Sequence, residues 1–309
     1  ELMGMSGNNV KILLDGIPLI DRGATKQSLS QLDVNSIERV EIVEGPMSVV
    51  YGTDALAGVI NIITKKGDGY SEENTWRVGA RVQEESMGKE YDFFKDKGLH
   101  NESIDLGFNH KSGLFVNGGY TRNNHGGWQG DLTGREKRWH PKDQALMNGM
   151  FGFQNRNMNV WYRLDFLDEK IFGPNNGSEL QPEKVSDKDF LTKRYTHQLQ
   201  SDWKLDNRLD VHAALSYQDY KRRTRTTESD LSTGEKWLSS AEASQDITQY
   251  KAWIARATVA WNIAPEFSVQ PGVEYQWTQG EGGRIDGTPK VSDLAFFLSA
   301  EYKPWEWLS

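Results

Sequence analysis

The sequence predicts a mainly β protein, in which a transmembrane antiparallel β-barrel wall of about ten strands follows a small N-terminal α/β domain. Of the 309 residues only 37% are hydrophobic, and the mean hydropathy is -0.69. That is low for a soluble core, which is usually built from a chain that is nearly half apolar. Eleven Trp and an aromatic content of 11% argue against disorder. From Trp76 onward, apolar and polar residues alternate at period two, as in a barrel with one lipid face and one wet face.

Charge and cysteine content exclude several classes of protein. The net charge is -8 and no long basic run is present, so nucleic-acid binding through phosphate contacts is not expected. Cysteine is absent, which excludes disulfides and thiolate metal sites. No stretch approaches the roughly 18 apolar residues of a membrane-spanning helix. No signal peptide is visible at residue 1, and we expect the chain to begin within a domain.

The N-terminal domain is expected to cover residues 1–67, with a polar linker at 68–75 and barrel strands over 76–309. Residues 10–14 and 59–63 read as strands, and Asp15-Gly16 is a hairpin-type turn signal. Ser36 is expected to cap one helical turn before the strand at 40–43.

The connections between the predicted barrel strands alternate strictly between short and long. Short links are expected near 111–113, 155–157, 206–207 and 264–266, and long polar links near 84–102, 123–144, 168–190, 222–246 and 279–290. Bacterial outer-membrane barrels show this alternation, with short periplasmic turns and long extracellular loops. Trp203, Trp261, Trp277 and Trp305 fall near strand ends, where aromatic belts are expected.

The first domain resembles the plug domain of TonB-dependent outer-membrane receptors. Several linked elements in the right order carry the resemblance: Asp15-Gly16-Ile17-Pro18, Ile37-Glu38-Arg39-Val40-Glu41, Gly45-Pro46, Tyr51-Gly52, and Gly58 to Thr64 with Asn61 at its centre. The match covers about the first fifth of the chain, whereas the match to the barrel is architectural.

The resemblance implies an integral outer-membrane receptor of a Gram-negative bacterium that imports a scarce, large solute. It further implies a 22-stranded barrel, so the chain would hold the C-terminal part of a plug and the first strands of the wall. The expected partners are the inner-membrane TonB complex, a small-molecule metal chelate, membrane lipid and a possible surface lipoprotein, with no nucleic acid. The motif looks most like receptors for ferric siderophores, haem or cobalamin. A passive porin and a glycan-importing receptor of the same family are the alternatives.

Two features of the plug motif have competing interpretations. The glycines at 45, 52 and 58 are interpreted first as turn or packing positions and second as hinges for plug movement. Arg39 is a candidate for pairing with a barrel glutamate, and Glu274 and Glu301 lie on the expected polar face of their strands. The chain departs from the usual family pattern at Glu44, where many members carry arginine before Gly-Pro.

No intrinsic cofactor and no catalytic function are expected, because no catalytic or nucleotide-binding motif is found. His125 and His140 lie in one long loop and could meet a haem iron, although surface histidine is commoner than ligand histidine. The spacing of His, Asp and Glu matches no resident metal site. Trp128, in the same loop, could stack on a ligand or anchor the loop at the membrane interface.

Overall fold

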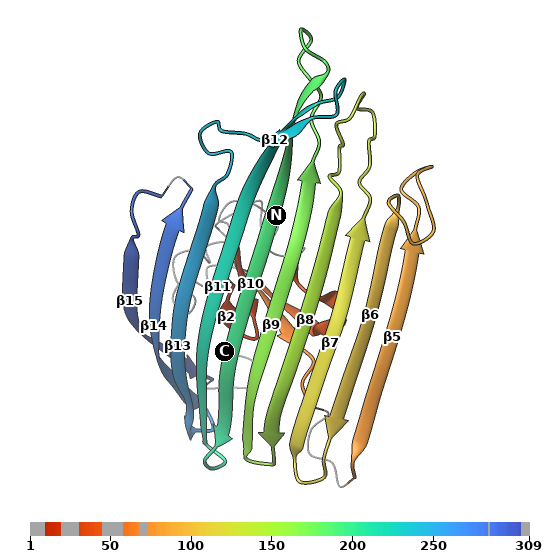
Figure 1. Ribbon diagram of the computed structural model, residues 1–309. Coiled ribbons are helices and arrows are strands. Elements are labelled where there is room, and N and C mark those ends of the chain that lie inside the picture. Colours follow the sequence, from red (N-terminus) through yellow and green to blue (C-terminus); the bar gives the residue numbers. More distant parts are fainter. Residues whose placement is uncertain (1–9, 20–30, 45–57, 68–72, 284, 304–309) are drawn as a thin grey trace.

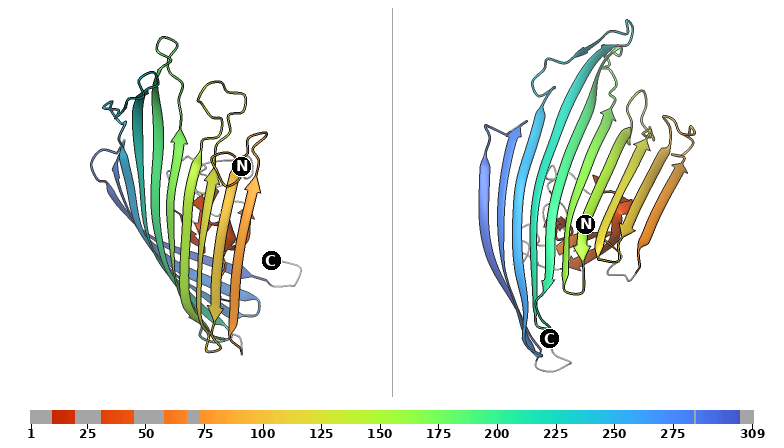
Figure 2. Two further views of the ribbon diagram at one scale, coloured as in Figure 1. Left: turned by 45° about the vertical axis from the view of Figure 1, so that its right-hand side comes forward. Right: turned by 60° about the horizontal axis from the view of Figure 1, so that its bottom comes forward.

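The computed structural model describes residues 10–19, 31–44, 58–67, 73–283 and 285–303, and these form two sheets. A small four-stranded sheet belongs to the plug, and a large sheet forms a curved wall. Figure 2 shows the plug strands inside the curve of the wall. Within these ranges, no helix is long and apolar enough to cross a membrane.

The plug sheet contains β1 (Val10–Leu14), β2 (Ile17–Pro18), β3 (Ile37–Glu44) and β4 (Gly58–Thr64), in the order β2-β1-β4-β3. Strands β1 and β4 run parallel, and the other neighbours are antiparallel. The turn between β1 and β2 places Asp15 at φ 50 and Gly16 at φ 80, so both central residues have positive φ, as a type I′ hairpin requires. The predicted Asp-Gly turn is therefore confirmed.

The helical turn predicted to begin at Ser36 is wrong, because β3 begins directly afterwards at Ile37. A 3-10 turn lies just before this strand instead, at Val34–Ser36. Asp33, not Ser36, is the N-cap, because its carboxylate accepts a hydrogen bond from the Asn35 backbone N–H at 3.0 Å. Within the described ranges the plug holds no α-helix.

The wall contains the ten predicted strands and one short additional strand. Their bounds are β5 Thr75–Glu85, β6 Leu99–Asn109, β7 Leu114–His125, β8 Lys142–Gln154, β9 Met158–Gly173, β10 Lys184–Lys204, β11 Leu209–Asp230, β12 Lys236–Leu238, β13 Ile247–Ala264, β14 Phe267–Gly282 and β15 Lys290–Tyr302. Each strand pairs with its sequence neighbour, except that β12 pairs β11 alone and β13 follows β11 in the sheet. The long connections gather at one end of the wall and the short ones at the other (Figure 1).

The face of the wall that points away from the plug carries a repeated apolar band. On β13 it runs from Trp253 to Trp261 at every second residue, and on β10 it includes Tyr195, Leu199 and Trp203, with His197 and Ser201 between them. Eight steps span about 26 Å along a strand at about 3.3 Å per residue. At the usual tilt of about 40° this length covers about 20 Å, which is most of an apolar band about 25 Å tall. The expected Trp305 lies outside the described residues.

We predict that replacing Asp15 opens the plug locally. Its buried carboxylate accepts hydrogen bonds from the Thr64 N–H at 3.0 Å and the Thr64 hydroxyl at 2.7 Å, and Lys66 Nζ lies 3.6 Å away. Asp15→Ala leaves those buried donors without an acceptor, so the free energy of local opening measured by hydrogen exchange in β1 and β4 should fall by about 1–3 kcal/mol.

Asp15→Asn is the matched control, because Asn tolerates positive φ and keeps a side-chain acceptor. In Asp15→Asn, the free energy of local opening should fall less than in Asp15→Ala. Unchanged exchange in Asp15→Ala would show that this carboxylate does not hold β1 to β4.

Candidate functional site: the seam between plug and wall

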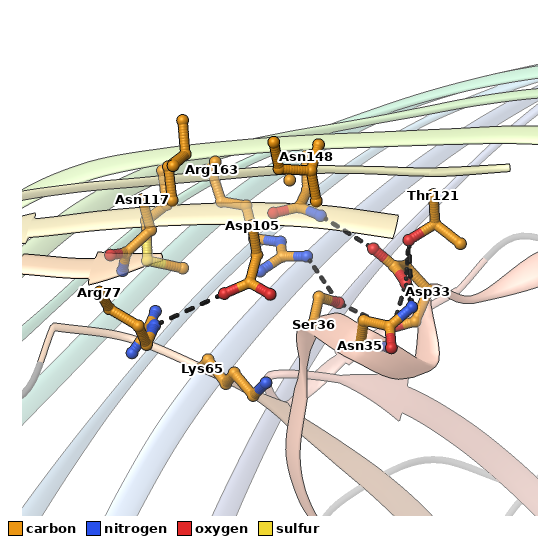
Figure 3. Close-up of a pocket in the computed structure, with 15 residues that line it drawn as sticks. Asp33, Asn35, Ser36, Lys65, Arg77, Asp105, Asn117, Thr121, Asn148 and Arg163 are labelled. Carbon is orange, nitrogen blue, oxygen red and sulfur yellow. Dashed lines mark hydrogen bonds and ion pairs between the residues drawn. The ribbon is translucent and has the colours of Figure 1, made fainter. Parts of the chain in front are cut away.

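The 3-10 turn of the plug is attached to the wall by the carboxylate of Asp33. Its Oδ1 accepts a hydrogen bond from the Thr121 hydroxyl of β7 at 3.0 Å. Its Oδ2 accepts one from the Asn148 side-chain amide of β8 at 3.1 Å. Asn35 adds a third contact by donating to Thr121 at 3.2 Å. The same side chain that caps the turn therefore fixes the turn to two neighbouring wall strands (Figure 3).

A buried network of hydrogen bonds around Gln31 lies beside this turn. The side-chain amide of Gln31 donates to Glu169 of β9 at 2.8 Å, and Gln144 of β8 donates to the other carboxylate oxygen at 2.8 Å. Arg194 of β10 donates to the backbone carbonyl of Gln31 at 2.8 Å. These four side chains are at most 4% exposed. Gln31 of the plug thus bridges the buried carboxylate of Glu169 and the buried guanidinium of Arg194. Both charged groups of the wall are therefore buried with a hydrogen-bond partner.

Three wall glutamines hold the β1–β2 hairpin by its backbone. Gln198 and Gln200 of β10 donate to the carbonyl oxygens of Leu14 and Asp15 at 3.2 and 2.8 Å. Gln218 of β11 donates to the carbonyl of Pro18 at 2.7 Å. All three are nearly fully buried. These bonds give the hairpin carbonyls buried donors on the wall.

Apolar contacts fill the spaces between the polar ones. Ile17 of the plug is buried together with Ala214 of β11 and Ile254 of β13. At the end of the plug, the Lys66 ammonium lies 4.9 Å from the ring centre of Trp161 on β9. The seam therefore combines hydrophobic packing with a cation–π contact and a continuous set of hydrogen bonds.

A narrow cleft separates the 3-10 turn from β5 to β9 (Figure 3). Arg163 of β9 lies in it, buried, with its guanidinium on both oxygens of Asp165 at 2.6 and 2.7 Å and on the Ser36 hydroxyl at 3.2 Å. The cavity volume is about 20 Å³, which is room for about one water molecule. The cleft belongs to the plug–wall contact and is too small for a bulky solute.

Several residues of the plug motif meet around one point. Asn61 of β4 accepts from the Gly16 N–H at 2.9 Å and donates to Glu41 of β3 at 3.2 Å, and Gly58 begins β4 with φ 138. The motif residues at 15, 16, 41 and 61 thus connect the hairpin turn with β3 and β4. Four further motif residues lie outside the described ranges: Gly45, Pro46, Tyr51 and Gly52. The hinge interpretation of the glycines at 45 and 52 therefore stays a prediction.

The expected link from Arg39 to a wall glutamate is not formed among the described residues. Arg39 is paired with Glu38 at 3.0 Å and Glu41 at 2.9 Å, while Glu274 faces Arg256 at 3.7 Å and Glu301 faces Lys303 at 2.8 Å. The physical reason is that β3 is the edge strand of the plug sheet and its arginine is half exposed beside two acids of its own strand. Glu44 is exposed at the end of this strand.

His125 does not lie in the loop, because it is the last residue of β7; Trp128 and His140 lie in the loop that follows, which is closed by a β-bridge between Trp128 and Trp139. Trp128 and Trp139 exchange two backbone hydrogen bonds, and their ring centres lie 5.3 Å apart. Arg135 fastens this loop to β10 through a bidentate pair with Asp187 at 2.6 and 3.0 Å, and to the next loop by donating to the Asn175 carbonyl at 2.8 Å. The aromatic pair is thereby held at the outer end of the wall, with Trp139 half exposed.

The side chain of His125, at the end of β7, hydrogen-bonds the start of this loop. Its Nδ1 accepts a hydrogen bond from the Gly127 N–H at 3.0 Å. An iron at Nδ1 would have to displace this bond. In the described ranges, no three His, Asp or Glu side chains are arranged to hold a metal ion.

Gln31, Asp33 and their wall partners are not among the site residues that the sequence predicts. A signal for the wall partners was present, because Gln198, Gln200 and Gln218 occupy alternate positions on the polar face of their strands. Gln31 and Asp33 lie between elements and have no periodicity that could have distinguished them.

We predict that Asp33→Ala loosens the turn at 33–37 without unfolding the wall. The change removes the acceptor of the Asn35, Thr121 and Asn148 hydrogen bonds. Hydrogen exchange of residues 33–37 should show local opening that is easier by about 1.5–3 kcal/mol, the range for bonds to a charged group. Glu38→Ala, an exposed acid on β3, should leave that segment unchanged. Equal protection in both variants would contradict a clamp at Asp33.

We also predict a pH dependence of the loop at 125–141. Burial and the charge of Lys142 hold the pKa of His125 below its ordinary value of 6.5, so the folded loop favours the neutral ring. This contribution to stability is complete above about pH 6.5 and is lost as the pH falls below it, because the opened loop takes up the proton. Hydrogen exchange at Gly127 between pH 5 and 8 should show it, and His125→Gln should remove the dependence. A slope that persists in the glutamine variant would assign it to another group.

Comparisons with known proteins agree with this arrangement. Residues 1–59 match the family model described as the TonB-dependent receptor plug domain. The vitamin B12 transporter BtuB of Vibrio vulnificus is 40% identical over 79 residues, which is 26% of this chain and 13% of the transporter.

Solved receptors share the fold across nearly the whole chain. The ferric yersiniabactin uptake receptor FyuA of Yersinia pestis has a TM-score of 0.56 at 13% identity, covering 94% of this chain and 52% of the receptor. A variant of the ferric enterobactin receptor PfeA of Pseudomonas aeruginosa has a TM-score of 0.66 at 14% identity, covering 97% of this chain and 48% of the receptor. This chain therefore spans about half the length of these solved receptors.

TonB-dependent receptors are integral proteins of the Gram-negative outer membrane, and in such a protein the outward apolar band of the wall would be the surface that faces lipid. Residues 1–59 thus belong to the TonB-dependent receptor plug domain family, and the strands that follow them have the wall fold of the solved receptors.

Proposed function

We propose that this chain is the plug and adjoining wall of a receptor that imports a scarce metal chelate across the outer membrane. The observation that carries the proposal is the plug–wall seam, in which buried side chains of β7 to β11 hold a folded plug inside the curve of the wall. In a passive pore, a folded plug in this position would block diffusion through the barrel. The plug match and the transporter and receptor relatives support the same conclusion.

The transported solute is proposed to be a ferric siderophore, haem or cobalamin. Relatives described as a vitamin B12 transporter, a copper transporter and receptors for ferric yersiniabactin and ferric citrate support a metal chelate as the substrate class. The interlocked outer loops with Trp128 and Trp139 would provide the first contact surface. The chain itself would hold no cofactor and perform no chemistry on the solute.

The energy for import is proposed to come from the inner-membrane TonB complex acting on the plug. Displacing the segment around Gln31 would separate it from Glu169 and Arg194, so each of these two buried charged groups would lose one of its hydrogen-bond partners. Such a step is strongly uphill without external work, so a force applied through a partner is a physically consistent drive. A surface lipoprotein partner has no support in the described contacts.

The proposal predicts a growth defect that depends on both receptor and TonB. A strain deleted for the full-length gene should fail to grow on one limiting nutrient among ferric siderophore, haem and vitamin B12. The wild-type gene should restore growth only when the TonB complex is intact. Growth restored equally without TonB would contradict active transport, and growth on every source without the gene would remove these solutes as its substrates.

A conductance measurement distinguishes the plugged receptor from a porin. The full-length wild-type protein in lipid bilayers should show little passive ion flow, because the plug occupies the wall. Combining Asp33→Ala with Gln31→Ala should raise the flow by loosening the seam, whereas Glu38→Ala should not. Large flow through the wild-type protein would support the porin alternative.

A further inference from the structure

Five basic residues gather on the outward face of β9, β10 and β11, close to the long loops, and together we call them the basic collar: Lys170, Lys193, Lys221, Arg223 and Arg225. Their direction follows from the alternation of the strands. Gln198 and Gln218 point to the plug, so odd positions of β10 and β11 point outward. On β9 the inward residues are odd, as Glu169 shows, so Lys170 also points outward.

The collar places like charges directly opposite one another. Lys193 and Lys221 are register partners across β10 and β11. In the next outward row Lys170 and Arg223 flank Leu191, which is the register partner of both. Like charges directly opposite on a sheet destabilise the pairing. The positions beyond β11 do not compensate, because the register partners of Lys221 and Arg223 on β13 are Gln249 and Ile247.

Acidic residues neutralise only part of this charge. Asp168 lies 3.4 Å from Lys193, and Asp189 lies 3.3 Å from Lys170 and 2.5 Å from Arg225. A third carboxylate, Asp143 of β8, is the register partner of Lys170 and pairs with Arg122 at 3.3 Å. Apart from this pair, two carboxylates face the five cations of the collar, and Lys221 and Arg223 are exposed. Asp219, one row closer to the membrane, is the register partner of Lys251. A local excess of about three positive charges remains on a surface that points away from the lumen.

The height of the collar agrees with a lipid headgroup. The apolar band ends at aromatic residues, where Phe166 and Tyr195 have ring centres 4.8 Å apart and Tyr217 and Trp253 have ring centres 4.7 Å apart. Lys193 lies two residues beyond Tyr195, which is about 7 Å along the strand. The headgroup region extends about 5–8 Å beyond the hydrocarbon core on each side. The collar begins at this level, on the side of the long loops.

We propose that the basic collar is a docking surface for a phosphate-bearing lipid of the outer leaflet. Arginine and lysine at headgroup height bind lipid phosphates, and Arg223 offers a fork that matches phosphate oxygens. A lipid with two phosphates would satisfy the Lys193–Lys221 pair and Arg223 together. The surface is separate from the plug seam and does not depend on which solute is imported.

The experiment compares lipid retention by the full-length protein purified in detergent, measured by native mass spectrometry. The probes are lipid A with two phosphates, lipid A with one phosphate, and inorganic phosphate. The test variant combines Lys221→Gln with Arg223→Gln. The control combines Lys204→Gln with Arg208→Gln, which removes two exposed cations at the opposite end of the same hairpin. Thermal unfolding of each variant confirms that it is folded.

The wild-type protein and the control should retain the two-phosphate lipid, and the test variant should bind it on the order of tenfold more weakly. The one-phosphate form should bind the wild-type protein more weakly than the two-phosphate form. Equal retention by test and control variants would overturn the proposal. Inorganic phosphate that displaces the lipid at equal concentration would show a free-phosphate site instead and would also overturn it. Lys193→Gln tests the same pair if the double variant fails to fold.

Discussion

The structure depends on one constraint, which is that the backbone carbonyls and charged groups of the plug need hydrogen-bond partners on the wall where little water enters. The plug offers the carbonyls of its hairpin and the carboxylate of Asp33, and the wall offers amides and hydroxyls. An unpaired buried polar group costs as much as several favourable contacts gain. The inward face of the wall is therefore polar because of the plug, and the plug needs only a small apolar core of its own.

Glutamine is the residue that makes this seam possible. Its amide donates to a carbonyl without bringing a charge into a buried space, as Gln198, Gln200 and Gln218 do. Gln31 in addition donates to Glu169 and accepts from Arg194, and so links these two charged side chains of the wall. A direct ion pair there would hold the wall strands to each other and leave the plug out. Because the contact passes through Gln31, the two wall charges are fully partnered only while the plug is in place.

The alternation of the wall strands made the fold predictable, whereas the seam depended on contacts between distant parts of the chain. Period two on β9, β11, β14 and β15, together with alternating short and long loops, predicted the ten strands. The Asp-Gly turn was predictable because backbone sterics restrict positive φ to few residues. The turn predicted after Ser36 is strand in the structure, and Asp33 caps a 3-10 turn that ends at Ser36, which only the position of the following strand could decide. Arg39 was assigned wrongly because its own neighbours, Glu38 and Glu41, are closer than any wall strand.

The two faces of the wall are fixed by one register, which links the plug to the membrane. On β10 the inward row includes Arg194, Gln198 and Gln200, and the outward row runs from Lys193 through Tyr195 to Trp203. A slip of one residue against β9 or β11 would turn the glutamines toward lipid and the aromatic residues toward the plug. Hydrogen bonds to the plug therefore select the same register that the apolar band selects. Both conditions are met at once, so the seam and the depth of the wall in the membrane stabilise each other.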